Sequence, residues 1–378
     1  MSIVISVPAE VRAGEQRVAL VPEIAKKLAA AGASIHIQTG AGQYAGYSDE
    51  DYQAAGASIS ADDALLGSAD IVLTVNPLSG EQLHKLRDNC VLIGYQNPWS
   101  ETVRFQLLQQ KGVSAFSMEL IPRISRAQAM DSLSSQASIA GYKGVLMAAS
   151  LSGKFFPMLT TAAGTVRPSK VLIIGAGVAG LQAIATARRL GAMVEAYDVR
   201  AAVKEQVESL GAKFVDIDIK AEGSGGYARE LTEEEKQKQQ AILARHVAAS
   251  DVVICTAAIP GRASPRIISA DMVNQMKGGA VIVDLAAEGG GNCELTRPGE
   301  THVHQRVTIH GPINVPATVP NHASELYAKN LFNLLGLIIR DNALHMDLDD
   351  PIIKDSLITH AGNIVNTAVR ERLQASGH

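Results

Sequence analysis

The chain has 378 residues, of which 47% are hydrophobic and 19% charged, as in an ordinary soluble globular protein. Lysine and arginine number 34 against 38 aspartates and glutamates, and the resulting net charge of −4 argues against nucleic acid as a partner. Aromatic residues make up 4% of the chain, too few for platforms on which bases stack. The length is large for a single core, so two domains are expected.

Neither a targeting segment nor a membrane span is evident in the sequence. The N-terminus lacks the basic-then-apolar pattern of a signal peptide, and no run approaches the roughly 20 apolar residues of a membrane helix. Cys90, Cys255 and Cys293 have the spacing of neither a zinc site nor a disulfide framework, which fits a reducing compartment. We therefore expect a soluble cytoplasmic chain without a metal, which can still dock on a membrane partner.

The first portion of the chain alternates strands with helices, an order typical of a parallel sheet wrapped by helices. Strands are predicted over residues 3–7, 34–38, 70–75, 90–95 and 113–118. Pro22 opens a helix at the favoured first position, and Gly32 closes it.

The character of the sequence changes at Glu119. Residues 122–136 are polar, with arginines, glutamines and serines, and they are followed by an apolar helix predicted over 138–152. Residues 160–168 resemble a linker. We expect this stretch to connect two lobes.

A buried strand that runs into a glycine turn and then a helix is the most informative segment. The strand over 170–174 is followed by Gly175, Ala176, Gly177, Val178, Ala179 and Gly180, the G-x-G-x-x-G fingerprint of dinucleotide binding. Gly175 permits the tight turn, Gly177 lets the backbone approach a pyrophosphate, and Gly180 lets the helix pack on the strand. The start of the helix offers N–H groups and a positive dipole end to phosphates.

The next predicted strand, 193–198, ends at an acidic residue. Asp198 stands where a carboxylate can accept hydrogen bonds from the adenine ribose hydroxyls. Its negative charge repels a 2′-phosphate and so favours NAD over NADP, an inference that the nearby Arg200 weakens. The order of strand, helix, strand and terminal acid makes a chance glycine cluster the weaker alternative.

The rest of the chain completes this lobe and returns to the first. Helices are predicted over 201–210 and 233–249, and strands over 213–217, 251–257, 280–285 and 308–315. The amphipathic helix over 323–339 is expected to cross back. The predicted domains are a discontinuous first α/β lobe, 1–135 plus 325–378, and an NAD-binding Rossmann lobe, 136–324. The expected fold class is α/β, with two Rossmann-like lobes, each a mostly parallel sheet flanked by helices, and a cleft between them.

Over nearly its whole length the chain resembles a known family. It is similar to the NAD(H)-binding component (domain I, alpha subunit) of proton-translocating NAD(P) transhydrogenases, a component related to alanine dehydrogenases. The polar segment 122–136 is the most specific match. Further matching segments are 175–183, Asp198-Val199-Arg200-Ala201-Ala202, Gly225-Gly226-Tyr227-Ala228 and Ile313-Asn314-Val315-Pro316.

The resemblance implies a role for the polar segment. Arg123, Gln128 and Asp131 would form a loop around the nicotinamide end of NAD(H), and Ser134 would help to hold the carboxamide. This fits their chemistry, because Asp131 can accept from the amide N–H₂ while Arg123 or Ser134 can donate to its carbonyl. Composition alone equally allows a solvated polar linker. Gln128 is expected near both nucleotides, and Tyr227 on a mobile loop that closes over the bound one.

Several further expectations follow from the resemblance. Asp198, Val199 and Arg200 would lie at the cofactor, and NADP(H) would be held on a partner, since this chain has no second fingerprint. The chain would form a homodimer. Membrane-embedded and NADP(H)-binding components would hold it at the inner membrane as a peripheral cytoplasmic component and couple hydride exchange to proton translocation.

A stand-alone alanine-type dehydrogenase is the main alternative. Its reaction needs a proton acceptor and a carboxylate anchor. The positions of that family's lysine and histidine carry Thr74 and Asn97, neither of which is a base near neutral pH. Arg17 matches the family's substrate arginine, and here we expect it to be structural and to pair with Glu10. Hydride exchange moves no proton and needs only two rings about 3–3.5 Å apart with water excluded. A catalytically silent NAD-binding module is the third possibility.

Overall fold

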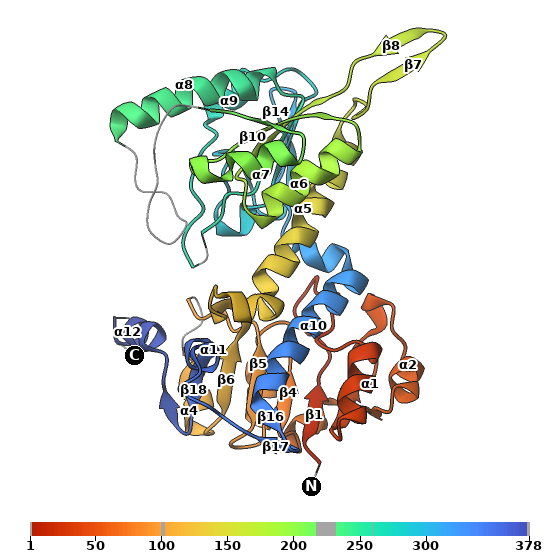
Figure 1. Ribbon diagram of the computed structural model, residues 1–378, viewed down its shortest axis with the longest axis vertical. Helices are drawn as coiled ribbons and strands as arrows, with labels where there is room; N and C mark the ends of the chain where they lie inside the picture. Colours follow the sequence, from red (N-terminus) through yellow and green to blue (C-terminus); the bar gives the residue numbers. More distant parts are fainter. Residues whose placement is uncertain (1, 100–102, 217–231, 260, 376–378) are drawn as a thin grey trace. The chain divides into compact units, whose positions relative to one another are not determined.

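The computed structural model describes residues 2–99, 103–216, 232–259 and 261–375. It divides into two compact units: unit 1 contains residues 1–136 and 317–378, and unit 2 contains residues 137–316. Each unit is built on a mostly parallel sheet flanked by helices, which confirms the predicted fold class (Figure 1).

The sheet of unit 1 has the order β19-β18-β6-β5-β4-β1-β2-β3 among the described residues. Its strands are β1 (Val4–Val7), β2 (Ser34–Gln38), β3 (Ser58–Ser60), β4 (Ile71–Leu73), β5 (Val91–Gly94), β6 (Ser114–Ser117), β18 (Leu357–His360) and β19 (Asn363–Ile364). Neighbours are parallel except that β18 runs antiparallel to both β6 and β19. The carboxyl ends of β1, β4, β5 and β6 therefore meet at one edge, where the loops that follow them carry polar side chains.

Local sequence signals explain where several helices of unit 1 begin. The helices are α1 (Pro22–Ala30), α2 (Asp49–Ala54), α3 (Gly80–Lys85), α4 (Arg104–Gln110), α10 (Pro320–Ile338), α11 (Pro351–Ser356) and α12 (Thr367–Ala375). Proline occupies the first turn of α1, α10 and α11, where a missing N–H is harmless. The apolar face of α10, with Tyr327, Leu331 and Leu334 fully buried, packs into the main core of the unit (Figure 1). A short hairpin, β16 (Ile339–Arg340) with β17 (Ala343–Leu344), follows α10.

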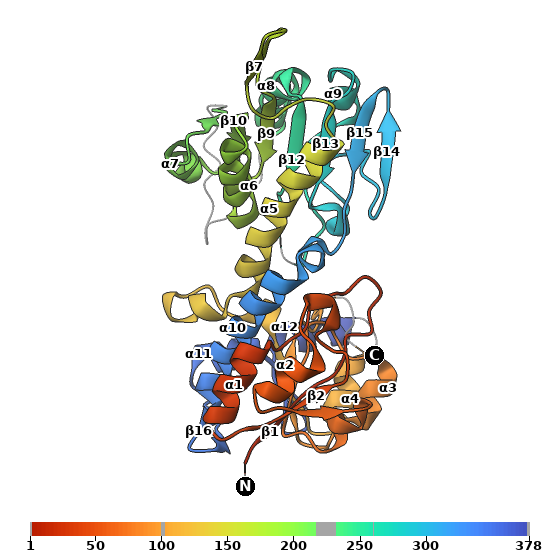
Figure 2. The same cartoon turned by 90° about the vertical axis from the view of Figure 1, so that its right-hand side faces the viewer.

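Unit 2 has a sheet with the order β11-β10-β9-β12-β13-β15-β14 among the described residues (Figure 2). Its strands are β9 (Lys170–Ile174), β10 (Met193–Tyr197), β11 (Lys213–Phe214), β12 (Val252–Cys255), β13 (Val281–Asp284), β14 (Thr301–His304) and β15 (Val307–His310). Of these described strands, only β14 and β15 form an antiparallel pair. The chain leaves β9 toward β10 on one side and later returns to β12 on the other, so β9 and β12 flank the point where the strand order reverses. In such sheets ligands bind at the carboxyl ends beside that point.

Helices cover both faces of this second sheet. They are α6 (Val178–Arg189), α7 (Lys204–Ser209), α8 (Glu233–Ala249) and α9 (Ala270–Asn274), together with most of α5 (Ser132–Leu151). Along β9, Val171 and Ile173 pack into one core, and Leu172 and Ile174 into the core on the opposite face. A strand buried on both faces reads as a continuous apolar run, which is why the strand was recognisable in the sequence.

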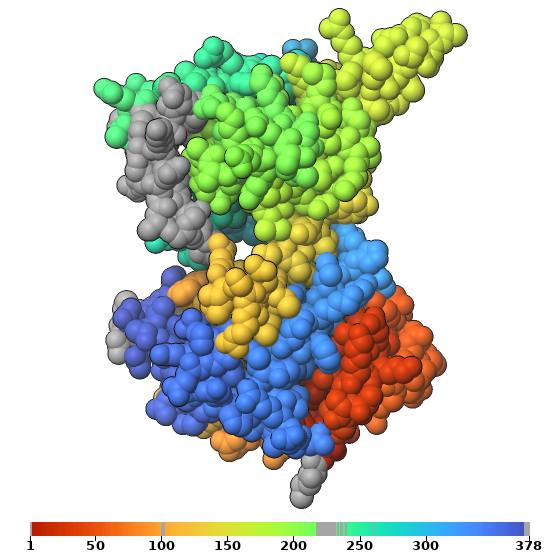
Figure 3. Space-filling view, viewed as in Figure 1, coloured from red at the N-terminus to blue at the C-terminus, as the bar shows by residue number. Residues whose placement is uncertain are grey.

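Two local expectations were wrong. Residues 160–168 contain a hairpin, β7 (Leu159–Thr161) with β8 (Gly164–Val166), that stands out from unit 2 (Figure 3). Helix α5 begins at Ser132 rather than near residue 138, because its polar first turn is capped by Asp131. In the described segments of the chain, no helix is both long and apolar enough to cross a membrane.

Candidate functional site

The glycine turn of unit 2 has the geometry that the fingerprint predicts. Gly175 follows β9 with φ +91°, and a Cβ there would lie 2.9 Å from the Thr256 hydroxyl. A Cβ on Gly180 would lie 1.9 Å from the carbonyl oxygen of Gly175, so only glycine lets α6 approach the turn. By contrast, a Cβ on Gly177 would meet nothing within 4 Å. Gly175 and Gly180 are therefore required by the fold, whereas the open space at Gly177 suits a ligand.

Helix α6 starts directly after this turn and is held from a second side. Gly177 is its N-cap and supplies no side-chain acceptor, so the turn leaves room for a ligand's oxygens at the first N–H groups. A Cβ on Gly141 of α5 would lie only 2.1 Å from the carbonyl oxygen of Ala179. The close approach of α5 fixes the first turn of α6. Val178 in that turn is 42% exposed, so its side chain is available for contact.

Asp198 follows β10 and binds the glycine turn as well as its own neighbour. Its Oδ2 accepts from the backbone N–H of Ala176 at 2.7 Å and from Arg200 Nη2 at 2.9 Å. Its Oδ1 accepts from the backbone N–H of Arg200 at 2.9 Å and from Arg200 Nε at 3.0 Å. Val199, between them, packs against the core on one face of the sheet. The structure thus brings Ala176, Asp198 and Arg200 together. Tyr227, the remaining predicted residue of this lobe, lies outside the described residues.

Two residues that the sequence analysis did not single out hold this turn in place. The Thr256 hydroxyl, just after β12, lies 2.9 Å from the carbonyl oxygen of Gly175 and 3.1 Å from that of Ile174 and donates to them. The fully buried Asn292 amide accepts from the N–H of Ala257 at 2.9 Å and donates to its carbonyl at 2.7 Å. A polar residue directly after a buried strand is a signal that could have identified Thr256.

Asn292 also reaches the far end of the loop that begins at Ala257. Its amide donates to the carbonyl of Pro265 at 2.8 Å. One side chain therefore ties together both ends of the segment between these residues, next to the glycine turn. Nothing in the sequence around Asn292 indicates this role, because its partners lie 27 and 35 residues away.

The polar segment of unit 1 is ordered by its neighbours rather than solvated along its length. Residues Ser125–Met130 form a 3₁₀ helix. Arg126 makes a salt bridge with Asp350, whose Oδ2 accepts from its Nη1 at 2.8 Å. Asn330 of α10 donates to the carbonyl of Ala129 at 2.9 Å. These contacts fix the backbone of the segment while the side chain of Gln128 stays exposed.

The predicted nicotinamide-binding residues have different surroundings within unit 1. Asp131 accepts from the Ser134 backbone N–H at 2.9 Å and from its hydroxyl at 2.6 Å, a cap for α5. The N–H of Asp131 in turn lies 3.3 Å from the carbonyl oxygen of Gln128. Asp131 and Ser134 are half-buried, and Arg123 is exposed. The structure therefore brings Gln128, Asp131 and Ser134 together in unit 1, whereas the glycine turn and Asp198 belong to unit 2.

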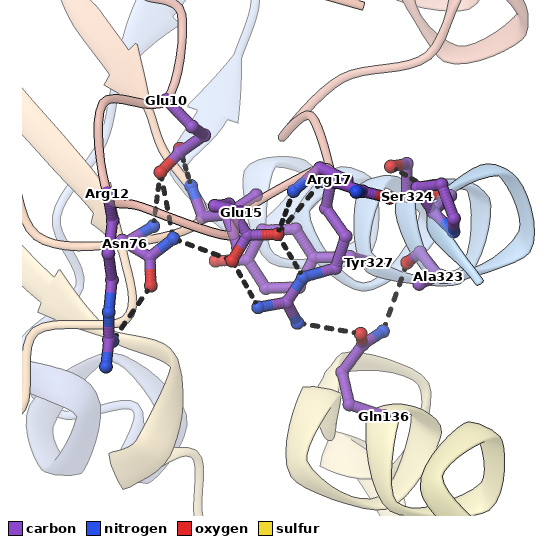
Figure 4. A network of polar contacts seen from close by, with 12 residues as sticks. Glu10, Arg12, Glu15, Arg17, Asn76, Gln136, Ala323, Ser324 and Tyr327 are labelled. Atoms are coloured by element: carbon purple, nitrogen blue, oxygen red, sulfur yellow. Dashed lines mark hydrogen bonds and ion pairs between the residues drawn. The ribbon is translucent and has the colours of Figure 1, made fainter. Parts of the chain in front are cut away.

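Arg17 lies in a buried polar network at the carboxyl edge of the unit 1 sheet (Figure 4). Its Nη2 lies 2.7 Å from Glu15 Oε2 and its Nε lies 2.8 Å from Glu15 Oε1, while Nη1 donates to Gln136 at 2.9 Å. The expected pairing with Glu10 is wrong. Glu10 instead accepts from the N–H of Val75 at 2.6 Å, beyond β4. The guanidinium takes Glu15 because a residue two positions away in the same loop presents both carboxylate oxygens to it.

Burial and bonding act in opposite directions on the two acids. Burial alone raises the pKa of Glu15, but the bond and charge of Arg17 outweigh it and lower the pKa to about 2. Burial raises the pKa of Glu10 to about 7, although Asn76 and Val75 donate to its carboxylate. The Asn76 amide bridges the two, at 3.0 Å from Glu10 and 2.8 Å from Glu15. Arg17 is thus committed to a carboxylate of its own chain.

The positions of the expected dehydrogenase base carry no group that titrates near neutrality. Thr74 is buried, and its carbonyl accepts from the Tyr327 hydroxyl at 2.9 Å. The backbone N–H of Asn97 donates to Glu119 at 2.8 Å. Within the described residues, no cluster of three or more histidine, cysteine or acidic side chains could hold a metal ion. The geometry therefore provides a dinucleotide turn and polar side chains, without a base at these two positions.

Comparison with known proteins identifies related chains over almost the full length. The family described as alanine dehydrogenase/PNT, N-terminal domain, matches residues 6–140, and its C-terminal domain matches residues 144–367. The first of the chains that make up NAD(P) transhydrogenase subunit alpha in Rhodospirillum rubrum is 45% identical over 377 residues, covering 97% of this chain and 98% of that protein.

A solved structure and a more distant relative complete the comparison. The crystal structure of transhydrogenase from Sinorhizobium meliloti matches with a TM-score of 0.88 and 42% identity, covering 96% of this chain and 100% of that one. Alanine dehydrogenase of Bacillus subtilis is 29% identical over 383 residues, covering 98% of this chain and 95% of that protein.

Proposed function

We propose that this chain, which belongs to the alanine dehydrogenase/PNT family, binds NAD(H) and exchanges a hydride with NADP(H) held on a partner component. The observation that carries the proposal is the glycine turn before α6, with open space at Gly177 and a carboxylate, Asp198, beside it. The transhydrogenase names of the relatives at 45% and 42% identity support the reaction type.

The residues of unit 2 fit a dinucleotide. Around Gly177 the backbone can approach a pyrophosphate, and the N-terminus of the 12-residue helix α6 carries the partial positive charge that favours it. Asp198 at the end of β10 can accept from the ribose hydroxyls. Asp198→Ala should weaken NADH binding by about 1.5–3 kcal/mol, the range for a hydrogen bond to a charged group. Unchanged affinity in a fluorescence titration would move the ribose elsewhere.

We assign the nicotinamide end to the polar segment of unit 1. When bound, NAD(H) supplies a ring carbon that gives or takes the hydride. Arg123 and Ser134 can donate to the carboxamide oxygen, and Asp131 can accept from its nitrogen. Gln128, exposed on a backbone that α10 and α11 hold in place, is suited to a position close to the second nucleotide. These residues orient and exclude water, and none has to move a proton.

The match to alanine dehydrogenases makes amino-acid oxidation the competing function. Such a reaction needs a cation to anchor the substrate carboxylate and a base to take a proton. Here Arg17 binds Glu15 and Gln136, and Thr74 and Asn97 stand where the base is expected. These observations favour hydride exchange without proton transfer. They also distinguish the chain from the dehydrogenases despite the shared fold.

Energy coupling and location belong to the same proposal. NADH and NADPH differ by a phosphate remote from the ring, so driven exchange needs an outside energy source. We propose that membrane-embedded partner components supply it through proton translocation and hold the chain at the cytoplasmic face of the inner membrane. The subunit names of the relatives support the existence of partners. We further propose that the chain acts as a homodimer.

The decisive experiment measures hydride exchange. The purified chain is mixed with an NADP(H)-binding component, NADPH and an NAD analogue whose reduced form absorbs at its own wavelength. We expect rapid reduction of the analogue that requires both proteins. Binding of both nucleotides without exchange would indicate a silent NAD-binding module. Robust reduction of NAD with alanine by the chain alone would identify a dehydrogenase instead.

A further inference from the structure

The carboxylate of Asp198 is saturated by donors from its own chain. A carboxylate offers about four acceptor positions. Four bonds occupy them: the backbone N–H groups of Ala176 and Arg200 at 2.7 and 2.9 Å, and Nε and Nη2 of Arg200 at 3.0 and 2.9 Å. The carboxylate side chain is 6% exposed, whereas the Arg200 side chain is 32% exposed. Two bonds therefore come from fixed backbone and two from a side chain that can leave.

A ribose with free 2′- and 3′-hydroxyls brings two donors to this carboxylate. The backbone bonds hold the glycine turn and the residue after β10, so exchanging them would disturb the turn that receives the pyrophosphate. The bonds of the Arg200 side chain can be exchanged without moving the backbone. We infer that Arg200 is a specificity-determining residue that covers Asp198 and that the ribose of NAD(H) must displace. This inference rests on the proposed binding of NAD(H).

The charge of Arg200 has a second consequence for nucleotide choice. Asp198 by itself repels a 2′-phosphate, since two anions a few ångströms apart at a partly buried position interact strongly. The guanidinium, bonded at 2.9 Å, neutralises that repulsion, and its fork geometry suits a phosphate as well as a carboxylate. Arg200 therefore both competes with the ribose of NADH and reduces the penalty against NADPH. Removing it should widen the difference between the two nucleotides from both sides.

The test is a set of binding titrations with NADH and NADPH on the full chain. Arg200→Ala is expected to tighten NADH binding at least about threefold, since two charge-assisted bonds no longer compete. NADPH binding should weaken, so that the ratio of the two dissociation constants grows by about tenfold or more. Arg200→Lys keeps the charge but loses the fork, and should give NADH affinity between those of wild type and Arg200→Ala. It also keeps the test open if the alanine variant folds poorly.

A matched control separates this effect from a general change of net charge. Arg189, exposed in the last turn of α6, is replaced by alanine in parallel and should leave both dissociation constants within about twofold of wild type. Weaker NADH binding by Arg200→Ala would overturn the inference and make Arg200 a ligand of the nucleotide. Equal effects of Arg189→Ala and Arg200→Ala would also overturn it. A wild-type chain that binds no NADH would refute the proposed function itself, a result that the same titration distinguishes.

Discussion

The Thr256 hydroxyl donates to the carbonyl of Gly175 across 2.9 Å, so the end of β12 holds the glycine turn that follows β9. The two strands are neighbours in the sheet at the point where the strand order reverses. The same carbonyl lies under Gly180, where any side chain would collide with it. The orientation of this one peptide thus sets both the approach of α6 and the direction of the N–H groups that follow.

Replacing Thr256 by valine should weaken nucleotide binding. Valine keeps the shape but removes the donor and leaves buried carbonyl oxygens without it, which costs about 1–3 kcal/mol of folding stability. We expect NADH affinity to fall by on the order of 1 kcal/mol, because the turn is less firmly oriented. Thr256→Ser restores the hydroxyl and should recover most of the affinity. Equal affinity of all three forms would show that the turn needs no support from β12.

How far the site could be predicted depended on whether its cause is local. Gly175 and Gly180 were predictable because each is required by contacts within a strand–turn–helix unit. Thr256 and Asn292 were not, because their partners lie 81 and 35 residues away in the sequence. The pairing of Arg17 was missed for a related reason, since two acids in the same loop were available and only the folded loop selects Glu15.

The polar segment illustrates a second limit of the sequence. Its serines and Asp131 resemble a loop by composition, yet they cap and begin α5. The same residue types serve at helix N-termini and in turns, so composition could not distinguish the two. The hairpin of β7 and β8 was missed because its strands are short and lack an alternating apolar pattern. The strands of the two sheets, by contrast, were predictable from continuous apolar runs.

Gln128→Asn should separate catalysis from binding. The side chain is exposed on a fixed backbone, and shortening it by one methylene removes its reach without disturbing the fold. We expect hydride exchange to slow by on the order of tenfold or more, with NADH affinity changed less than about twofold. Gln53→Asn, at an exposed position on α2, serves as the control and should change neither. Equal losses in exchange and affinity would reduce Gln128 to a residue that retains the cofactor.

The hairpin of β7 and β8 provides a test of the proposed homodimer. Met158 beside it is 64% exposed and Val166 within it is 46% exposed, and an isolated two-stranded hairpin is marginally stable in water. We expect a second copy of the chain to cover these side chains. Met158→Glu should raise the dimer dissociation constant about tenfold or more in sedimentation experiments. Val303→Glu, at a 67% exposed position on β14, should leave it unchanged. A monomeric wild type at micromolar concentration would contradict the proposal.

The buried pair of Glu15 and Arg17 predicts how stability depends on acid. The pKa of Glu15 is lowered from 4.5 to about 2, so its contribution is complete above pH 4.5 and is lost as the pH falls toward 2. That loss amounts to about 3 kcal/mol of unfolding free energy. Glu10 acts in the opposite sense, since its pKa is raised to about 7 and its ionisation costs stability between pH 4.5 and 7. Below pH 4.5 Glu10 is protonated in both states, so the acid limb reports Glu15.

Glu15→Gln isolates this contribution in urea unfolding measured from pH 2 to 7. At neutral pH the variant should be less stable by about 3–5 kcal/mol, because a buried cation loses its carboxylate. The difference from wild type should shrink as the pH falls, since wild-type Glu15 then becomes neutral as well. Glu23→Gln removes an exposed carboxylate that pairs with Lys27 on α1, and should differ little from wild type at any pH. A Glu15→Gln deficit that stays constant down to pH 2 would mean that packing, rather than the charge of Glu15, stabilises this loop.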